Sequence, residues 1–261
     1  MSALRRPLTW TVLLGAGLLG GAAAGGRGLL RRQAAAVRTV IGKPLGEDAL
    51  AADRTWKKKY GDPVDLLVLG DSIAAGLGAE KPKHTLGASL ARRLARRTHR
   101  AVRLHTAAVV GSESSALAAQ LASLPASYVA DVAVVVVGGN DVTHRVPVAT
   151  SVRHLADCVR TLQEQGTRVV VGTCPDLGAL RMVPQPLRAL GSRASRQLAA
   201  AQARTARSLG AAVVPLAEVV GPSFVAEPET MFSLDGFHPS AAGYERTARA
   251  LLPGVVAALE P

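Results

Sequence analysis

From residue 64 onward, short apolar runs alternate with longer amphipathic stretches, and this alternation limits the chain to a small set of folds. The predicted strands are residues 64–69, 102–108, 132–137, 168–172 and 212–215. The predicted helices are residues 86–98, 115–121, 148–165, 194–209 and 240–258. Strands that alternate with helices in this way predict an α/β domain, in which helices cover both faces of a mainly parallel, five-stranded sheet.

The composition agrees with such a fold. Of the 261 residues, 48% are hydrophobic and 3% are aromatic, so we expect one sizeable domain over residues 64–261 with a core of small aliphatic side chains. In open parallel sheets, ligands bind beyond the carboxyl ends of the strands. We expect Ser72, Gly111, Asn140 and Cys174 to lie there, because each follows a predicted strand.

Three short motifs carry residues that suit hydrolytic chemistry. Ser72 ends a Gly-Asp-Ser motif after the first predicted strand, Asn140 follows the third predicted strand, and Asp235 precedes His238 by three residues. A serine becomes a nucleophile when a histidine removes its proton, and a nearby carboxylate can orient that histidine. Each motif alone is more often a turn or a helix cap, but the three in this order indicate a serine hydrolase.

In their order and separation over roughly residues 64–258, these motifs resemble those of the SGNH hydrolases, also called the GDSL lipase/esterase family. The resemblance implies a three-layer α/β/α, flavodoxin-like fold. It also implies that Ser72 is the nucleophile, that His238 is the general base and that Asp235 orients the imidazole. The oxyanion hole would then consist of the backbone N–H groups of Ser72 and Gly111 and the side-chain amide of Asn140.

Gly111 departs from the family pattern, because the asparagine that often precedes this glycine is absent. Its alignment depends on its position after the second predicted strand. The neighbouring Ser112 is the alternative donor in this segment.

The resemblance implies a carboxylic-ester hydrolase that needs no metal and no cofactor and that forms an acyl-serine on a small-molecule, lipid or envelope-linked ester. One alternative is acyl transfer to an alcohol by the same residues, and another is a membrane-tethered binding protein without turnover. We see no long aromatic or aliphatic groove that would indicate a lipid tail. Residues 74–82 and the irregular segment after Cys174 are interpreted as pocket walls, a mobile lid or ordinary connecting loops.

The N-terminus suggests contact with a membrane. Residues 8–26 carry no charge and are flanked by arginines, and this length can just cross a hydrocarbon core of ~30 Å. We expect an uncleaved anchor over residues 1–32 with an extracytoplasmic catalytic domain; the alternatives are a signal cleaved near residues 22–24 and an amphipathic surface segment. Residues 33–63 are interpreted as a basic tether or a mere spacer.

The positive charge does not predict a nucleic-acid partner. The formal net charge is +12, but residues 1–60, with 11 Lys or Arg and 3 Asp or Glu, contribute +8 of it. Within the predicted domain, the basic residues at 92, 93, 96, 97 and 100 are interpreted as a solvated helix flank. Cys158 and Cys174 are expected to be buried free thiols, with a disulfide between them as the alternative. The sequence leaves the oligomeric state open.

Overall fold

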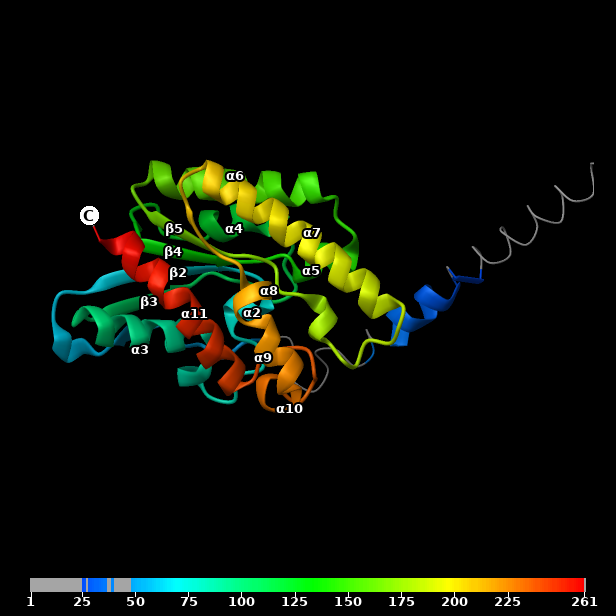
Figure 1. Cartoon of the computed structure of the whole chain (residues 1–261). Helices are drawn as coiled ribbons and strands as arrows, with labels where there is room; N and C mark the ends of the chain where they lie inside the picture. The colour runs from blue at the N-terminus through cyan, green and yellow to red at the C-terminus, as the bar shows by residue number, and fades with distance from the viewer. Residues whose placement is uncertain (1–24, 27, 37–38, 40–47, 261) are drawn as a thin grey trace, which may run out of the picture.

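The computed structural model describes residues 25–26, 28–36, 39 and 48–260, and a six-stranded sheet lies at its centre (Figure 1). The strands are β1 (Thr55–Trp56), β2 (Val64–Gly70), β3 (Val102–Thr106), β4 (Val132–Val136), β5 (Arg168–Gly172) and β6 (Ala212–Val214). They lie in the order β1-β3-β2-β4-β5-β6. Every neighbouring pair is parallel except β1 with β3.

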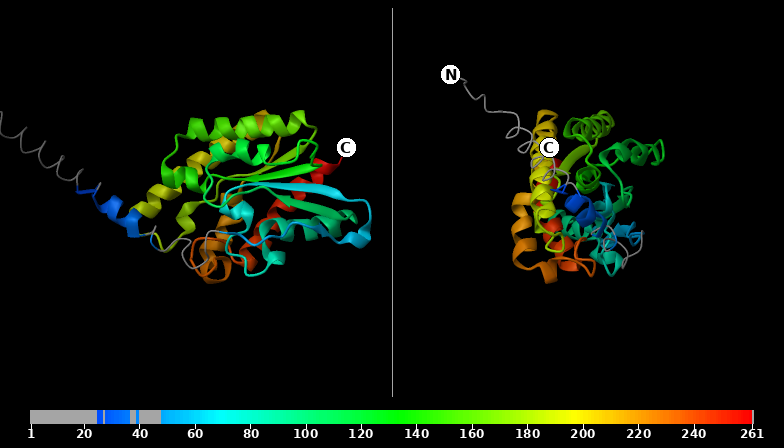
Figure 2. Two further views of the ribbon diagram at one scale, coloured as in Figure 1. Left: turned by 180° about the vertical axis from the view of Figure 1, so that it is seen from behind. Right: turned by 90° about the vertical axis from the view of Figure 1, so that its right-hand side faces the viewer.

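Two layers of helices cover opposite faces of the sheet (Figures 1 and 2). One layer contains α3 (Leu86–Thr98) and α11 (Ala241–Leu259), and the other contains α4 (Leu117–Ala122), α6 (Val148–Glu164) and α7 (Leu187–Ser208). The shorter α-helices are α2 (Ser72–Ala75), α5 (Gly139–His144), α8 (Leu216–Val219), α9 (Gly221–Ala226) and α10 (Pro228–Met231). Single 3-10 turns are η1 (Lys58–Tyr60), η2 (Pro82–His84), η3 (Ser114–Ala116) and η4 (Leu177–Ala179). The predicted three-layer α/β/α architecture is confirmed.

Alternating residues of β2 fill two separate hydrophobic cores. Leu66 and Val68 belong to the core that includes α3 and α11, whereas Leu67 and Leu69 belong to the core that includes α4 and α6. Successive side chains of a strand point to opposite faces, so a strand between two helical layers buries apolar side chains on both faces. The uninterrupted apolar runs of the sequence predict the central strands for this reason.

The sheet has one strand more than the five predicted. Strand β1 is antiparallel to β3, with Thr55 opposite Arg103 and Trp56 opposite Val102. Trp56 is 7% exposed, and its ring lies 3.8 Å from the guanidinium carbon of Arg54. A strand of two residues is too short to show an alternating pattern in the sequence. It lies within residues 33–63, the segment interpreted as a tether, and adds an edge strand to the sheet.

The long helices agree with the predicted ranges within a few residues, except at the start of α7. The sequence predicts a start at residue 194, whereas the helix begins at Leu187, directly after Pro186. A proline at the start of a helix does not interrupt it, because an N–H there would have no helical partner. Arg100, predicted on the flank of α3, lies beyond its end and pairs with Asp62 at 2.9 Å.

Two glycines let the chain turn where β2 and β4 end. Gly70 has a φ of +135°, and a Cβ atom there would lie 1.8 Å from the carbonyl oxygen of Val136. Gly138 also has a φ of +135°, and a Cβ atom there would lie 3.0 Å from Cβ of Cys174. Residues with a side chain rarely adopt this conformation. The carboxyl ends of β2, β4 and β5 therefore approach closely and bring together the residues that follow them.

Candidate active site

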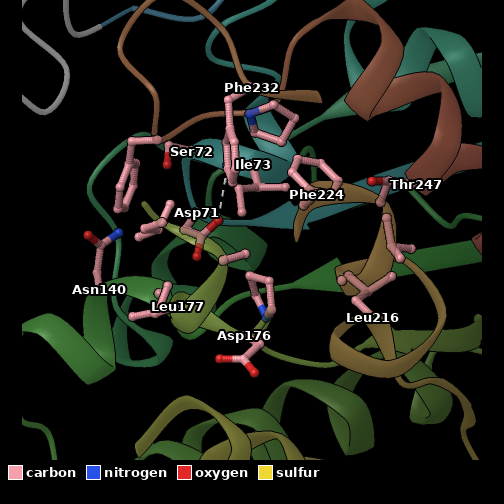
Figure 3. Close-up of a pocket in the computed structure, with 18 residues that line it drawn as sticks. Asp71, Ser72, Ile73, Asn140, Asp176, Leu177, Leu216, Phe224, Phe232 and Thr247 are labelled. Atoms are coloured by element: carbon pink, nitrogen blue, oxygen red, sulfur yellow. Dashed lines mark hydrogen bonds between the residues drawn. The ribbon is translucent and has the colours of Figure 1, made fainter. Parts of the chain in front are cut away.

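Ser72 is the first residue of the short helix α2 and lies directly beyond the end of β2. The N-cap of this helix is Asp71, whose Oδ1 atom accepts a hydrogen bond from the backbone N–H of Ile73 at 3.0 Å. The helix ends after one turn at Gly76, which has a φ of +91°. Ser72 is therefore held at a tight strand-to-helix turn, at the wall of a pocket (Figure 3).

Asp235 and His238 lie on one tight loop between α10 and α11. The backbone N–H of Ser233 donates a hydrogen bond to the carbonyl oxygen of His238 at 2.8 Å and closes this loop. Gly236 supports the turn with a φ of +62°, in the left-handed region that favours glycine.

The structure brings Ser72, His238 and Asp235 into one chain of hydrogen bonds. Nε2 of His238 lies 2.9 Å from Oγ of Ser72, and Nδ1 of His238 lies 2.6 Å from Oδ2 of Asp235. The side chain of His238 is 4% exposed, and that of Asp235 is 0% exposed. An imidazole placed between a hydroxyl and a buried carboxylate can take the hydroxyl proton and hold it as an imidazolium.

Asp235 is held as a carboxylate by several donors. Its Oδ1 atom accepts hydrogen bonds at 2.9 Å from the Ser233 hydroxyl and from the backbone N–H groups of Phe237 and His238. Burial alone would raise the pKa of Asp235, but the hydrogen bonds from the His238 ring and from these two N–H groups outweigh it and lower the pKa to about 2. Asp235 is therefore ionised throughout the neutral range.

A second buried carboxylate, Asp71, links the Ser72 turn to the turn that carries Asn140. Its Oδ2 atom accepts a hydrogen bond from the backbone N–H of Gly138 at 3.3 Å. Burial raises the pKa of Asp71 to about 6, although hydrogen bonds from the N–H groups of Ile73, Gly139 and Gly138 oppose the rise.

Asn140 lies on α5, and its side-chain amide faces the same pocket as Ser72 (Figure 3). The Nδ2 atom donates a hydrogen bond to the carbonyl oxygen of Ser112 at 3.0 Å, which leaves its second N–H available. Gly111 lies in a turn that is closed by a 3.2 Å hydrogen bond from the Ser112 N–H to the Val109 carbonyl oxygen, and its φ is +80°. Ser112, the alternative to Gly111, thus holds Asn140 through its carbonyl group.

The pocket beside Ser72 is mostly apolar. In Figure 3, Ser72 and Asn140 lie at one end, and Leu216 and Thr247 lie at the other. Its lining residues are Asp71, Ser72, Ile73, Gly139, Asn140, Pro175, Asp176, Leu177, Ala179, Leu180, Leu216, Val220, Gly221, Phe224, Phe232, Phe237, Pro239 and Thr247. The segment after Cys174 thus forms part of the wall, whereas residues 74–82, all of which the structure describes, are not among its lining residues.

All three phenylalanines of the chain line this pocket. The rings of Phe224 and Phe232 meet edge to face, with centroids 4.9 Å apart. Phe237 lies on the loop that carries His238, and its ring packs edge-on against the imidazole. The sequence pattern does not reveal this aromatic lining, because its residues come from a short helix and two loop positions.

The two cysteines and the basic residues of α3 lie outside the hydrogen-bonded chain of Ser72, His238 and Asp235. Cys158 and Cys174 are both buried and free. Within the described ranges, no three His, Cys, Asp or Glu side chains are grouped as metal ligands would be. Arg93 of α3 forms an ion pair with Glu245 of α11, so part of the basic flank joins two helices.

The comparisons with known proteins agree with this geometry. The sequence profile of the GDSL-like Lipase/Acylhydrolase family matches residues 68–246, a range that includes Ser72, Asn140, Asp235 and His238. The chain belongs to this family. The GDSL-like esterase Rv1075c of Mycobacterium tuberculosis is 39% identical to it over 234 residues, which is 86% of this chain and 74% of that protein.

Two solved structures share the fold. The lipase/acylhydrolase from Enterococcus faecalis superposes with a TM-score of 0.58 at 20% identity, over 76% of this chain and 98% of its own. The crystal structure of TesA gives a TM-score of 0.56 at 27% identity, over 76% of this chain and 98% of its own. This chain is therefore a GDSL-type hydrolase that acts on ester bonds. Neither acyl transfer nor binding without turnover is supported by these relatives.

Sequence reasoning missed two groups that support the site of this GDSL hydrolase. Asp71 enters the sequence pattern only as part of the Gly-Asp-Ser motif, although an aspartate directly before a serine at a helix start is a signal for an N-cap. Ser233 belongs to none of the three motifs, although a hydroxyl two residues before an aspartate can bond to that carboxylate.

The predicted membrane segment, residues 8–26, lies outside the described residues except for Gly25 and Gly26. Among the helices that the structure does describe, none combines the length and the apolar character needed to cross a membrane.

Proposed function

We propose that this hydrolase cleaves carboxylic esters through an acyl-serine intermediate on Ser72. His238 Nε2 accepts the Ser72 hydroxyl proton while Oγ attacks the ester carbonyl carbon, and the carbonyl oxygen becomes an oxyanion. When the tetrahedral intermediate collapses, the C–O bond to the alcohol breaks and the imidazolium returns the proton to the leaving alkoxide. Water then attacks the acyl-serine by the same steps, releasing the acid and restoring the Ser72 hydroxyl. The observation that carries this proposal is the 2.9 Å contact of Ser72 Oγ with His238 Nε2 beside an apolar pocket.

Asp235 stabilises the imidazolium that forms during each half of the reaction. Its low pKa keeps it charged, and the 2.6 Å contact with Nδ1 leaves Nε2 facing the serine. The Ser72 N–H, the Gly111 N–H and the free N–H of Asn140 Nδ2 are the proposed donors to the oxyanion. Losing one such donor in a comparable hydrolase costs about 2.7–4 kcal/mol of transition-state stabilisation.

The acyl group of the substrate occupies the apolar pocket in this proposal. A pocket lined by three phenylalanines and several aliphatic residues favours an acid with a hydrocarbon chain over a sugar or a charged acid. Lipid and envelope-linked esters carry such acyl chains, and so do small fatty esters.

We also propose that residues 8–26 anchor the chain in the cell membrane, with the catalytic domain outside the cytoplasm and the part of residues 33–63 that precedes the folded domain as the connection. The alternative is secretion after cleavage near residues 22–24. The support is the uncharged stretch between arginines. Carbonate extraction of membranes that contain the full chain, followed by N-terminal sequencing, distinguishes an integral anchor from a cleaved signal.

Hydrolysis of p-nitrophenyl esters of increasing acyl length by the full chain tests the enzymatic proposal. We expect turnover with an optimum at an aliphatic acyl chain, and a loss of about 10⁴-fold or more in the variant Ser72→Ala. Ser208→Ala, which changes an exposed serine at the end of α7, is the control and is expected to keep wild-type turnover. Equal activity of the Ser72→Ala variant and the wild type would refute the mechanism.

A further inference from the structure

The side chain of Gln120 joins the end of β2 to the loop that contains Gly111. Gln120 lies on α4 and is 3% exposed. Its Oε1 atom accepts a hydrogen bond from the Gly70 N–H at 2.9 Å, and its Nε2 atom donates to the Gly70 carbonyl oxygen at 2.8 Å. Nε2 also lies 3.4 Å from Oγ of Ser112. One buried amide therefore contacts both the residue two before Ser72 and the residue after Gly111.

Gly70 lies at the end of β2, where the neighbouring strand β3 no longer pairs with it. On the β4 side of β2, Gly70 is paired with Val136. On the β3 side, the last pair is Val68 with Thr106, two residues before Gly70. The N–H and carbonyl groups of Gly70 that face β3 thus lie beyond the last pair of the ladder. Unpaired backbone groups at a buried position are costly. Gln120 Oε1 is the acceptor for the Gly70 N–H, and Gln120 Nε2 shares the Gly70 carbonyl oxygen with the Val109 N–H, so these two contacts fix the orientation of the amide.

The same contacts hold the candidate oxyanion-hole donors at fixed positions. The Gly70 carbonyl oxygen also accepts a 3.2 Å hydrogen bond from the Val109 N–H, so one end of the Val109-to-Ser112 turn is bonded to β2 directly and the other is linked to it through Gln120. The carbonyl oxygen of Ser112 in turn accepts the hydrogen bond from Asn140 Nδ2. A path of hydrogen bonds thus runs from Gly70 through Gln120 and Ser112 to Asn140.

We infer that Gln120 is a positioning residue that sets the geometry of the oxyanion hole. This inference rests on the proposed function of Ser72 and Asn140. Donors to an oxyanion stabilise the transition state only where they are already aimed at the developing charge, so a displaced turn lowers the rate of the chemical step more than it weakens substrate binding.

The test is the variant Gln120→Met in the full chain, because methionine fills a similar volume without any amide group. We expect kcat to fall about 10- to 100-fold, with KM within about twofold of the wild type. The inhibition constant of a trifluoromethyl ketone, which forms a tetrahedral oxyanion on the serine, should rise by the same factor by which kcat/KM falls. The variant Gln120→Asn keeps an amide that is too short to reach Gly70, and we expect the same pattern from it if the methionine variant does not fold.

Leu162→Ala controls for a general loss of stability. Leu162 is 1% exposed on α6 in the core that β2 shares with α4 and α6, near the opposite ends of the strands from the site. We expect this variant to be less stable but to keep wild-type kcat below its melting temperature. If the Gln120 variants lose no more kcat than Leu162→Ala, or if the inhibition constant does not change, the inference is wrong. A wild type that neither hydrolyses esters nor reacts at Ser72 would instead refute the proposed function itself.

Discussion

The Oγ atom of Ser72 and the Nε2 atom of His238 lie 2.9 Å apart, although 166 residues separate them in the chain. Ser72 is held by the end of β2, and His238 is held by a loop in front of α11. Tyr244 of α11 joins these two parts, because its hydroxyl donates to the carbonyl oxygen of Leu77 at 2.5 Å, just beyond α2. The packing of α11 against the sheet therefore sets the distance between the serine and the histidine.

Replacing Asp235 with asparagine should remove most of the activity without unfolding the chain. An asparagine cannot stabilise the imidazolium, and its amide favours the wrong tautomer of His238, so we expect kcat to fall about 10⁴-fold, as in other serine hydrolases. Ser233→Ala removes one of the hydrogen bonds to Asp235 and should cost far less. Steady-state kinetics of both variants provide the check, and similar losses in the two variants would contradict the assigned roles.

Removing the Asn140 amide should affect kcat more than KM. The variant Asn140→Ala loses one proposed oxyanion donor, so we expect kcat to fall about 10²- to 10³-fold. Asn140→Asp should be at least as impaired, because a carboxylate would repel the oxyanion. The measurement compares kcat and KM of each variant with those of the wild type on one ester. An unchanged kcat in Asn140→Ala would exclude this residue from the oxyanion hole.

Shortening Leu216 should shift the preferred acyl length upward. Leu216 lines the pocket at the end opposite Ser72 and is 3% exposed, so Leu216→Ala opens space where an acyl chain would end. Leu251→Ala removes an equally large buried side chain of α11 that does not line the pocket. Both variants should lose about 2–5 kcal/mol of unfolding free energy. Only Leu216→Ala should change the optimum in the p-nitrophenyl ester series, and an identical optimum in both would contradict the acyl site.

The stability of the chain should depend on pH through Asp71. Its pKa rises from 3.8 to about 6 on folding, so the folded state binds more protons than the unfolded state between these values. The contribution of Asp71 to the free energy of unfolding therefore falls by about 3 kcal/mol as the pH rises from about 4 to 6. Urea unfolding of the wild type and of Asp71→Asn at pH 4, 5, 6 and 7 isolates this effect, because asparagine does not titrate. Parallel pH dependence of the two proteins would show that Asp71 titrates normally.

Asp235 changes the free energy of unfolding with pH in the opposite direction to Asp71, and at lower pH. Its pKa is lowered to about 2, so its contribution to stability is present above about pH 4 and is lost as the pH falls towards 2. The wild type and Asp71→Asn share this contribution, and it cancels in their comparison.

The sequence predicts the sheet and the long helices well, because both depend on apolar periodicity that each segment carries by itself. Strands β2 to β6 lie inside the predicted ranges, except that β2 extends one residue further, to Gly70. Strand β1 and the short helices around the pocket are not predicted, because their own two to six residues carry no clear apolar period. These elements are stabilised by the core beneath them, as the burial of Trp56 and Phe224 illustrates.

In the active site, too, features carried by one segment can be predicted, whereas features that depend on the folded structure cannot. Ser72, Asp235 and His238 can be predicted because each lies in a local motif whose spacing has a chemical reason. The contact of Gln120 with Gly70 and that of Asp71 with Gly138 cannot be predicted in this way, because these residues become neighbours only after the strands pair. The phenylalanine-lined pocket is hidden in the sequence for the same reason.

Ser72 acts as an activated nucleophile in the proposed mechanism. The most direct test treats the full chain with a fluorophosphonate, which transfers its phosphonyl group to an activated serine with loss of fluoride, and maps the adduct by peptide mass spectrometry. We predict one adduct, on Ser72, that forms in parallel with the loss of ester hydrolysis and is absent from Ser72→Ala and His238→Ala. An enzyme that hydrolyses esters yet carries no adduct on Ser72 after complete inactivation would show that Ser72 is not the nucleophile.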